Sequence, residues 1–170
     1  MNVSTSSALK ITPCLWFDSD AEDAAALYVS VFPNSRITLV SRHTKAGFEH
    51  HGKPAGSLLA VNFELCGQPF MAINGGPVFK LSEAMSLSVS CDTQEEIDYY
   101  WEKLGADGDA ACQNCGWLKD RFGLSWQIVP GILAALVSDP TTSASVMQAV
   151  FSMTKLDLQR IRDAAKSATH

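Results

Sequence analysis

The sequence has few basic residues and no cluster of them. Lysine and arginine number 13 against 18 aspartates and glutamates, so the formal charge is −5 and the pI is near 5.2. A protein that binds the phosphate backbone of a nucleic acid needs a basic stripe on its surface. We therefore expect no nucleic acid among the partners of this protein.

Long apolar runs are also missing. No stretch approaches the roughly 18 apolar residues of a membrane span, and residues 1–10 are polar and serine-rich, without the apolar centre of a secretory signal. The five cysteines are an odd number in a chain with no secretion signal, which favours reduced thiols over a disulfide framework. These absences predict a cytoplasmic protein with no membrane partner.

What the chain does have is a repeat. The 170 residues are 46% hydrophobic, which is enough to bury a core. Alternating apolar residues and an acidic, alanine-rich stretch predict, for the first half, the order strand 11–17, helix 19–31, and strands 36–42, 58–65 and 68–74. After the turn at Asn74–Pro77 the same order returns as strand 85–91, helix 92–104 capped by Asp92 or Thr93, and strands near 109–112, 117–121 and 124–129.

The tail after Pro130 reads as helical. Apolar residues at helical spacing predict helices over 132–137, 141–153 and 156–166. We therefore predict an α+β fold in which two tandem βαβββ modules form cupped mixed sheets around a cavity; two unrelated α+β hairpin units are the alternative. The expected boundaries, within one integrated domain, are 11–75 and 84–130 for the modules and 131–170 for the tail.

A homodimer is expected for two reasons. Paired modules leave open sheet edges, and the apolar stripes of the tail, such as Val146 with Val150 and Leu158 with Ile161, need a surface to cover.

Three segments carry a resemblance to a known family. They are Ile11–Asp18, Gly67–Pro77 and Cys115–Pro130. They resemble the PhnB-like branch of the vicinal oxygen chelate (glyoxalase/bleomycin resistance/dioxygenase) superfamily, a branch that often carries the label 3-demethylubiquinone-9 3-methyltransferase. The resemblance extends from Ile11 to Asp157 and implies paired βαβββ modules, cupped eight-stranded sheets and frequently a homodimer.

The resemblance also implies a divalent metal, held by histidine and carboxylate ligands from the first, fourth, fifth and eighth strands. The matching windows, 11–14, 70–74, 85–88 and 125–129, contain no His, Asp or Glu. Gln127 lies where the resemblance places the eighth-strand glutamate, and a neutral amide is a poor metal ligand. We therefore expect neither a metal nor another cofactor in the cavity.

The methyltransferase label implies a cofactor site that can be looked for in the sequence. An enzyme that uses S-adenosylmethionine typically has a doubly wound sheet with a glycine-rich loop between its first strand and a helix. The one comparable cluster, Asn74–Pro77, follows the strand predicted at 68–74 and precedes no helix. We interpret it as a turn.

Two other groups of possible ligands have simpler interpretations. His50 and His51, beside Glu49, could coordinate a metal, but their glycine-rich setting favours a surface loop. Cys112 and Cys115 have the spacing of half a zinc site or of a redox pair, but a second pair of ligands is not evident, so structural thiols are favoured.

What remains is a cavity lined by aromatics, hydroxyls and amides, with no evident general base. Such a lining suits a small, largely apolar molecule with a few polar anchors. We predict a metal-free binding protein for a small, partly aromatic molecule; the alternatives are a metal-dependent lyase or dioxygenase, or a methyltransferase acting on a ubiquinone precursor. The candidate ligand-binding residues are Trp16, Asn62, Met71, Asn74, Phe79, Ser86, Ser88, Trp117 and Gln127.

Overall fold

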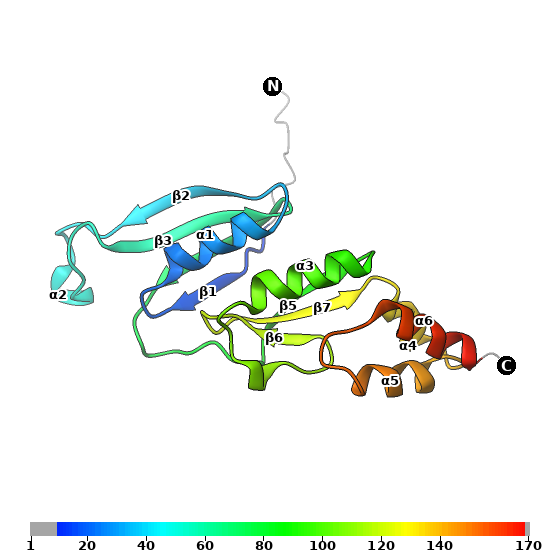
Figure 1. Ribbon diagram of the computed structural model, residues 1–170. Helices are drawn as coiled ribbons and strands as arrows, with labels where there is room; N and C mark the ends of the chain where they lie inside the picture. The colour runs from blue at the N-terminus through cyan, green and yellow to red at the C-terminus, as the bar shows by residue number, and fades with distance from the viewer. Residues whose placement is uncertain (1–9, 169–170) are drawn as a thin grey trace, which may run out of the picture. The chain divides into compact units, whose positions relative to one another are not determined.

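The computed structural model describes residues 10–168 of the chain. The serine-rich stretch 1–9 and the terminal His170 lie outside the described residues. The chain divides into two compact units, one ending at Leu81 and one beginning at Ser82, and each is described by itself (Figure 1). No helix in the described part of the chain is long and apolar enough to cross a membrane.

The first unit is a mixed sheet covered on one face by a helix (Figure 1). The strands lie in the order β1-β4-β3-β2; β1 runs parallel to β4, and the other neighbours are antiparallel. In chain order the elements are β1 (Cys14–Phe17), α1 (Ala21–Val31), β2 (Arg36–Arg42), the short α2 (Phe48–His51), β3 (Leu58–Leu65) and β4 (Gln68–Asn74).

Strand alternation separates the two faces of this sheet. On the helix side, Tyr28 of α1 meets Phe63 of β3, whose ring stacks on Phe70 of β4 at 5.5 Å between centroids. On the other side, Asn62 pairs in register with Met71, and both side chains are half-buried. The period of two along each strand therefore puts the apolar core under α1 and leaves the second face partly open.

The second unit repeats the plan with a smaller sheet and adds the tail. Its strands lie in the order β5-β7-β6, with β5 parallel and β6 antiparallel to β7. The elements are β5 (Ser86–Cys91), α3 (Gln94–Gly105), the 3-10 turn η1 (Ala110–Cys112), β6 (Trp117–Lys119), β7 (Ser125–Pro130), α4 (Leu133–Ser138), α5 (Ser143–Phe151) and α6 (Leu158–Ser167). The α+β fold expected from the sequence is confirmed.

Two local expectations were wrong. The segment 109–112 is not a strand: Asp109 caps a 3-10 turn by accepting a hydrogen bond from the Ala111 amide at 2.9 Å, and alanine has low strand propensity. The surface loop expected around His50 and His51 contains the short helix α2, which is capped at both ends by a glycine with positive φ. Of the two proposed caps of α3, Thr93 is the one whose side chain accepts, from the Glu96 amide.

A buried carboxylate holds the β6–β7 turn. Asp120 is 3% exposed, and its Oδ2 accepts the indole N–H of Trp126 at 2.9 Å. Its Oδ1 accepts the backbone amides of Phe122 and Leu124. These bonds place the Trp126 ring on the face of β7 that also carries Ile128, and both are fully buried beneath α3.

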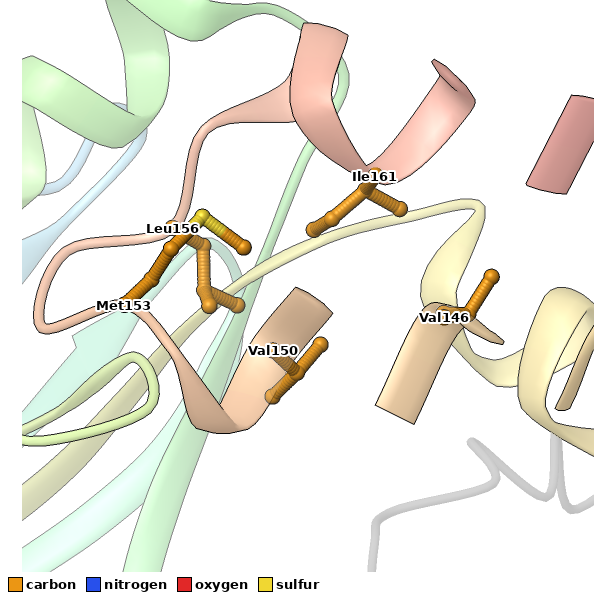
Figure 2. Close-up of a cluster of buried hydrophobic side chains, with 5 residues drawn as sticks. All are labelled: Val146, Val150, Met153, Leu156 and Ile161. Carbon is orange, nitrogen blue, oxygen red and sulfur yellow. The ribbon is translucent and has the colours of Figure 1, made fainter. Parts of the chain in front are cut away.

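The tail packs within its own unit through one apolar cluster, drawn in Figure 2, made of Val146, Val150, Met153, Leu156 and Ile161. The segment between α5 and α6 pairs with the turn before β6, because the Cys115 amide donates to the Met153 carbonyl and the Gly116 amide to that of Thr154. The expectation that the tail's stripes need a partner surface was therefore wrong, since these residues are buried inside the second unit.

Candidate functional site

A groove of about 490 Å³ lies on the face of the second sheet opposite α3. Ser88, Gln127 and Trp117 form one row across β5, β7 and β6, and all three line it. The next row, Ser90 and Val129, continues the floor toward the tail. Strand alternation produces this floor because Trp126 and Ile128, between these residues in sequence, point the other way into the core.

The tail forms the opposite wall. The side chains that reach the groove from α4 are Leu133, Ala134 and Val137, and those from α5 are Met147, Val150 and Phe151. Every one of them is apolar. The two walls therefore differ in kind, with hydroxyl and amide groups on the sheet side and hydrocarbon on the tail side.

Gln127 is oriented by a strand-to-strand bond. Its Nε2 donates to the hydroxyl of Ser86 at 2.8 Å, so Ser86 positions Gln127 and is itself absent from the lining. Because an amide nitrogen carries two hydrogens, Gln127 keeps one N–H donor as well as its acceptor oxygen for a ligand. The predicted residues Ser88, Trp117 and Gln127 are thus brought together in one groove, with Ser86 behind them.

Trp16 and Phe79 form a separate aromatic contact in the first unit. Their rings meet edge to face at 4.9 Å between centroids, and Trp16 Nε1 donates to the Gly76 carbonyl at 2.9 Å. The indole lies flat over Gly75, where an added Cβ would come within 2.0 Å of the ring. Gly75 therefore makes room for Trp16.

Asn74 has a structural task in the same unit. Its Oδ1 accepts the Ala21 amide at 2.9 Å and its Nδ2 donates to the Ser19 carbonyl at 2.9 Å, so it ties the end of β4 to the start of α1. Asn62 and Met71 lie side by side on the half-open face of the first sheet. These residues belong to a different unit from the groove.

A polar recess lies beside the start of α1. It is lined by charges of both signs, among them Asp18, Asp23 and Lys53, and Arg42 forms a two-pronged ion pair with Glu22 at 2.8 and 3.1 Å. Because the charged groups are largely paired or exposed to solvent, the recess is a weaker candidate for a small-molecule site than the apolar groove.

The possible metal ligands are dispersed. Within residues 10–168, no three His, Cys, Asp or Glu side chains gather in a metal-binding group. The Cys112 thiol points at Asp109 and Glu83, and Glu83 is paired with the Lys119 ammonium. Burial, then the Asp109 hydrogen bond, raises the pKa of Cys112, which opposes the thiolate that zinc requires.

The groove contains residues that the sequence reasoning missed. Ser90 and Val129 follow from the period of two once the face of Gln127 is known. The apolar stripe of helix 141–153 indicated that this helix packs against another part of the protein. It did not indicate that the other part is the open face of the second sheet. Cys115 lines the groove from the turn before β6, and its pattern in the sequence carried no signal for this.

Comparison with known proteins places the chain in a family. The sequence profile described as 3-demethylubiquinone-9 3-methyltransferase matches residues 9–129. A PhnB protein structure from Bacillus cereus is 36% identical with a TM-score of 0.63, and the match covers 72% of this chain and 99% of that one. A structure from Pseudomonas aeruginosa is 19% identical with a TM-score of 0.52, covering 70% and 95%, and supports the fold alone.

No protein with curated annotation matches the chain. The profile match nevertheless spans most of the sequence, and the Bacillus cereus relative is aligned over almost its whole length. Both agree with the resemblance carried by the segments around Trp16, Met71 and Gln127. The chain therefore belongs to the PhnB-type 3-demethylubiquinone-9 3-methyltransferase family and has its glyoxalase-like fold.

Proposed function

We propose that this protein binds a small, partly aromatic molecule, without a metal, in the groove on the open face of its second sheet. The observation that carries the proposal is the row Ser88, Gln127 and Trp117, which puts a hydroxyl, an amide and an indole on one wall of a mainly apolar groove. A mainly apolar recess with a few convergent polar groups is the usual form of a small-molecule site.

The groove's chemistry favours binding over metal-dependent turnover. Gln127 brings no negative charge to offset a divalent cation, and none of the other lining side chains is a carboxylate or an imidazole. Apart from the Cys115 thiol, no lining side chain is of a type that commonly acts as a general base. A protein with this lining can hold and orient a neutral molecule, as in sequestration or sensing.

Methyl transfer to a ubiquinone precursor is the alternative that the family name suggests. The described residues do not fit S-adenosylmethionine, because both sheets are mixed and the glycines after β4 lie against Trp16. That glycine pair precedes β5, not a helix, so it offers no helix N-terminus to a nucleoside. A thermal shift produced by S-adenosylmethionine would support this alternative over simple binding.

Titration with N-phenyl-1-naphthylamine tests the proposal, because this fluorescent probe is aromatic, uncharged and carries one N–H. We expect saturable binding at one site per chain, unchanged by EDTA. Trp117→Ala should weaken it about 10-fold, the scale of a lost aromatic contact and its buried area.

Trp16→Phe is the matched control, since Trp16 is a half-buried tryptophan of the other unit. It should leave the affinity unchanged. Loss of binding in Trp16→Phe with retention in Trp117→Ala would place the ligand outside the groove and overturn the proposal.

The proposed compartment is the cytoplasm. All five cysteines are free in the structure, from the exposed Cys66 to the buried Cys91, as expected for a reducing compartment. Cell fractionation with an antibody to the protein tests this.

A further inference from the structure

The tail that walls the groove lies outside the family match. The match ends at residue 129, whereas the first tail helix, α4, begins at Leu133 and α5 and α6 follow it. The Bacillus cereus relative is covered over 99% of its length by only 72% of this chain. The part of the groove built by α4 and α5 is therefore a feature of this chain that the family match does not include.

The tail is held firmly enough to act as a fixed wall. Beyond the cluster of Figure 2, Gln94 of α3 accepts the Leu158 amide at 2.8 Å and donates to the Leu156 carbonyl at 3.3 Å. Lys155 pairs with Asp98 of α3. Contacts to α3 and to the turn before β6 thus fix the segment that follows α5, and α5 is anchored in turn by Val146 and Val150.

The wall carries no charge and no hydrogen-bonding side chain. From α4 and α5 the groove receives only alkyl, thioether and phenyl groups, whereas the hydroxyls and the amide are confined to the sheet. A charged ligand would lose its hydration without gaining a partner there. An apolar ligand with a hydroxyl or N–H on one edge would satisfy both walls.

We propose that the C-terminal tail sets the ligand selectivity of this protein, making the groove a site for an uncharged amphiphile whose apolar skeleton lies against α4 and α5. The donor edge of that ligand faces the amide oxygen of Gln127 and the hydroxyl of Ser88. This inference rests on the proposed function and adds the ligand's charge and the residues that select it, chiefly Ala134 and Met147.

The first test fills the groove from the tail side. Ala134 and Ala135 are adjacent, exposed residues of α4, but only Ala134 lines the groove. Ala134→Trp should weaken N-phenyl-1-naphthylamine binding by about 10-fold or more, the scale of overpacking in a filled site. Ala135→Trp should leave it unchanged, and both variants should keep the parent's circular dichroism spectrum.

The second test changes the charge of the wall. The probe 8-anilinonaphthalene-1-sulfonate has the same skeleton as N-phenyl-1-naphthylamine plus one negative charge. The parent should bind the neutral probe more tightly, whereas Met147→Lys should lose affinity for it and gain affinity for the sulfonate. Gln148→Lys, one residue along α5, exposed and outside the groove, should show the parent's preference.

The outcomes separate the two proposals. If Trp117→Ala weakens probe binding while Ala134→Trp and Met147→Lys behave like their controls, the groove binds ligand but the tail does not select it, and this inference is overturned. If Trp117→Ala has no effect, the proposed function fails first. Stronger binding of the sulfonate than of the neutral probe by the parent protein would also overturn the inference.

Discussion

Gln127 on β7 and Ser86 on β5 are joined across two parallel strands by a 2.8 Å hydrogen bond from Nε2 to Oγ. The two residues are not level in the ladder, because Ser86 pairs with Ser125 and Gln127 with Ser88. The bond therefore runs diagonally and fixes the rotamer of Gln127. It also holds a neutral amide, which can still accept and donate one hydrogen bond, at the position where the resemblance led us to expect a carboxylate in metal-dependent proteins.

Gln127→Ala tests the part played by this amide. We expect the variant to weaken binding of N-phenyl-1-naphthylamine by about 5-fold, because it loses a hydrogen bond of about 1 kcal/mol. Elemental analysis of dialysed parent protein, supplied with Mg, Mn, Fe, Ni and Zn, should find none of them near one per chain. A stoichiometric metal that Gln127→Ala removes would contradict the metal-free site.

Gly116→Ala should loosen the tail from the sheet. A Cβ at Gly116 would lie 2.9 Å from the Ile128 carbonyl and 2.9 Å from the Leu156 side chain, at a φ of +83°. Gly123 is the control, because its φ is +87° and its added Cβ would meet nothing within 4 Å. Gly123→Ala should cost about 1–2 kcal/mol for the left-handed backbone alone, and Gly116→Ala about 1–3 kcal/mol more.

Urea unfolding followed by circular dichroism measures the difference between these two variants. Because the tail walls the groove, only Gly116→Ala should also weaken probe binding. Equal unfolding midpoints for the two variants would show that the added Cβ at position 116 is accommodated without cost, and would contradict this prediction.

Cys91 should be the least reactive thiol. Burial, with added repulsion from Glu96 and Asp92, raises the pKa of Cys91 to about 11, so its thiolate is scarce at pH 8. Titration of the native protein with 5,5′-dithiobis(2-nitrobenzoic acid) at pH 8 should label the exposed Cys66 quickly and Cys91 only after unfolding. Cys91→Ser should not change the count of fast thiols, whereas Cys66→Ser should lower it by one.

The loop after β2 should open as the pH falls. Burial, then the nearby charges of His51 and Lys53, lowers the pKa of His43 below its ordinary 6.5. Above about pH 6.5, His43 is neutral in both the closed and the opened loop, so its pKa shift does not affect the balance between them. Below that value the opened loop binds more protons than the closed one, so the closed form loses stability until the pH reaches the lowered pKa.

Hydrogen exchange of the Gly56 amide, which donates to the His43 carbonyl, reports this opening. After correction for intrinsic rates, exchange should be faster at pH 5.5 than at pH 7.5. His43→Gln should abolish the difference, and His50→Gln should keep it because the His50 side chain is exposed. If His43→Gln exchanges its Gly56 amide with the same pH dependence as the parent, a group other than His43 causes the opening and the prediction is wrong.

The homodimer stays a prediction, now supported by only one of its two original reasons, the open sheet edge. The tail no longer supports it, but β2 is an edge strand of the first sheet and exposes Ile37, Leu39 and Val40. Light scattering at micromolar concentration should report twice the 18.4 kDa of one chain. Leu39→Lys should shift the protein toward the monomer, and a monomeric parent would refute the prediction.

The sequence by itself determined the order of most elements and which residues share a face. Strands 36–42, 58–65 and 68–74 were placed at their observed bounds. Alternation fixes their faces, and only two residues, Cys66 and Gly67, are left for the turn between the last two strands. The placement of Ser86 and Ser88 on one face of their strand followed from the same period of two. Local pattern failed at 109–112, where the Asp109 side chain captures a backbone amide and turns the chain before a strand can form.

Only the tertiary structure decided which of the candidate residues meet. The sequence could place Asn74 near a cavity, but the fold uses both halves of its amide to tie β4 to α1. The sequence could also show that the tail has an apolar stripe. It could not show that α5 would face Val129 and Gln127 across a groove. Spacing encodes which side of an element is apolar, whereas the partner of that side depends on packing between segments far apart in the chain.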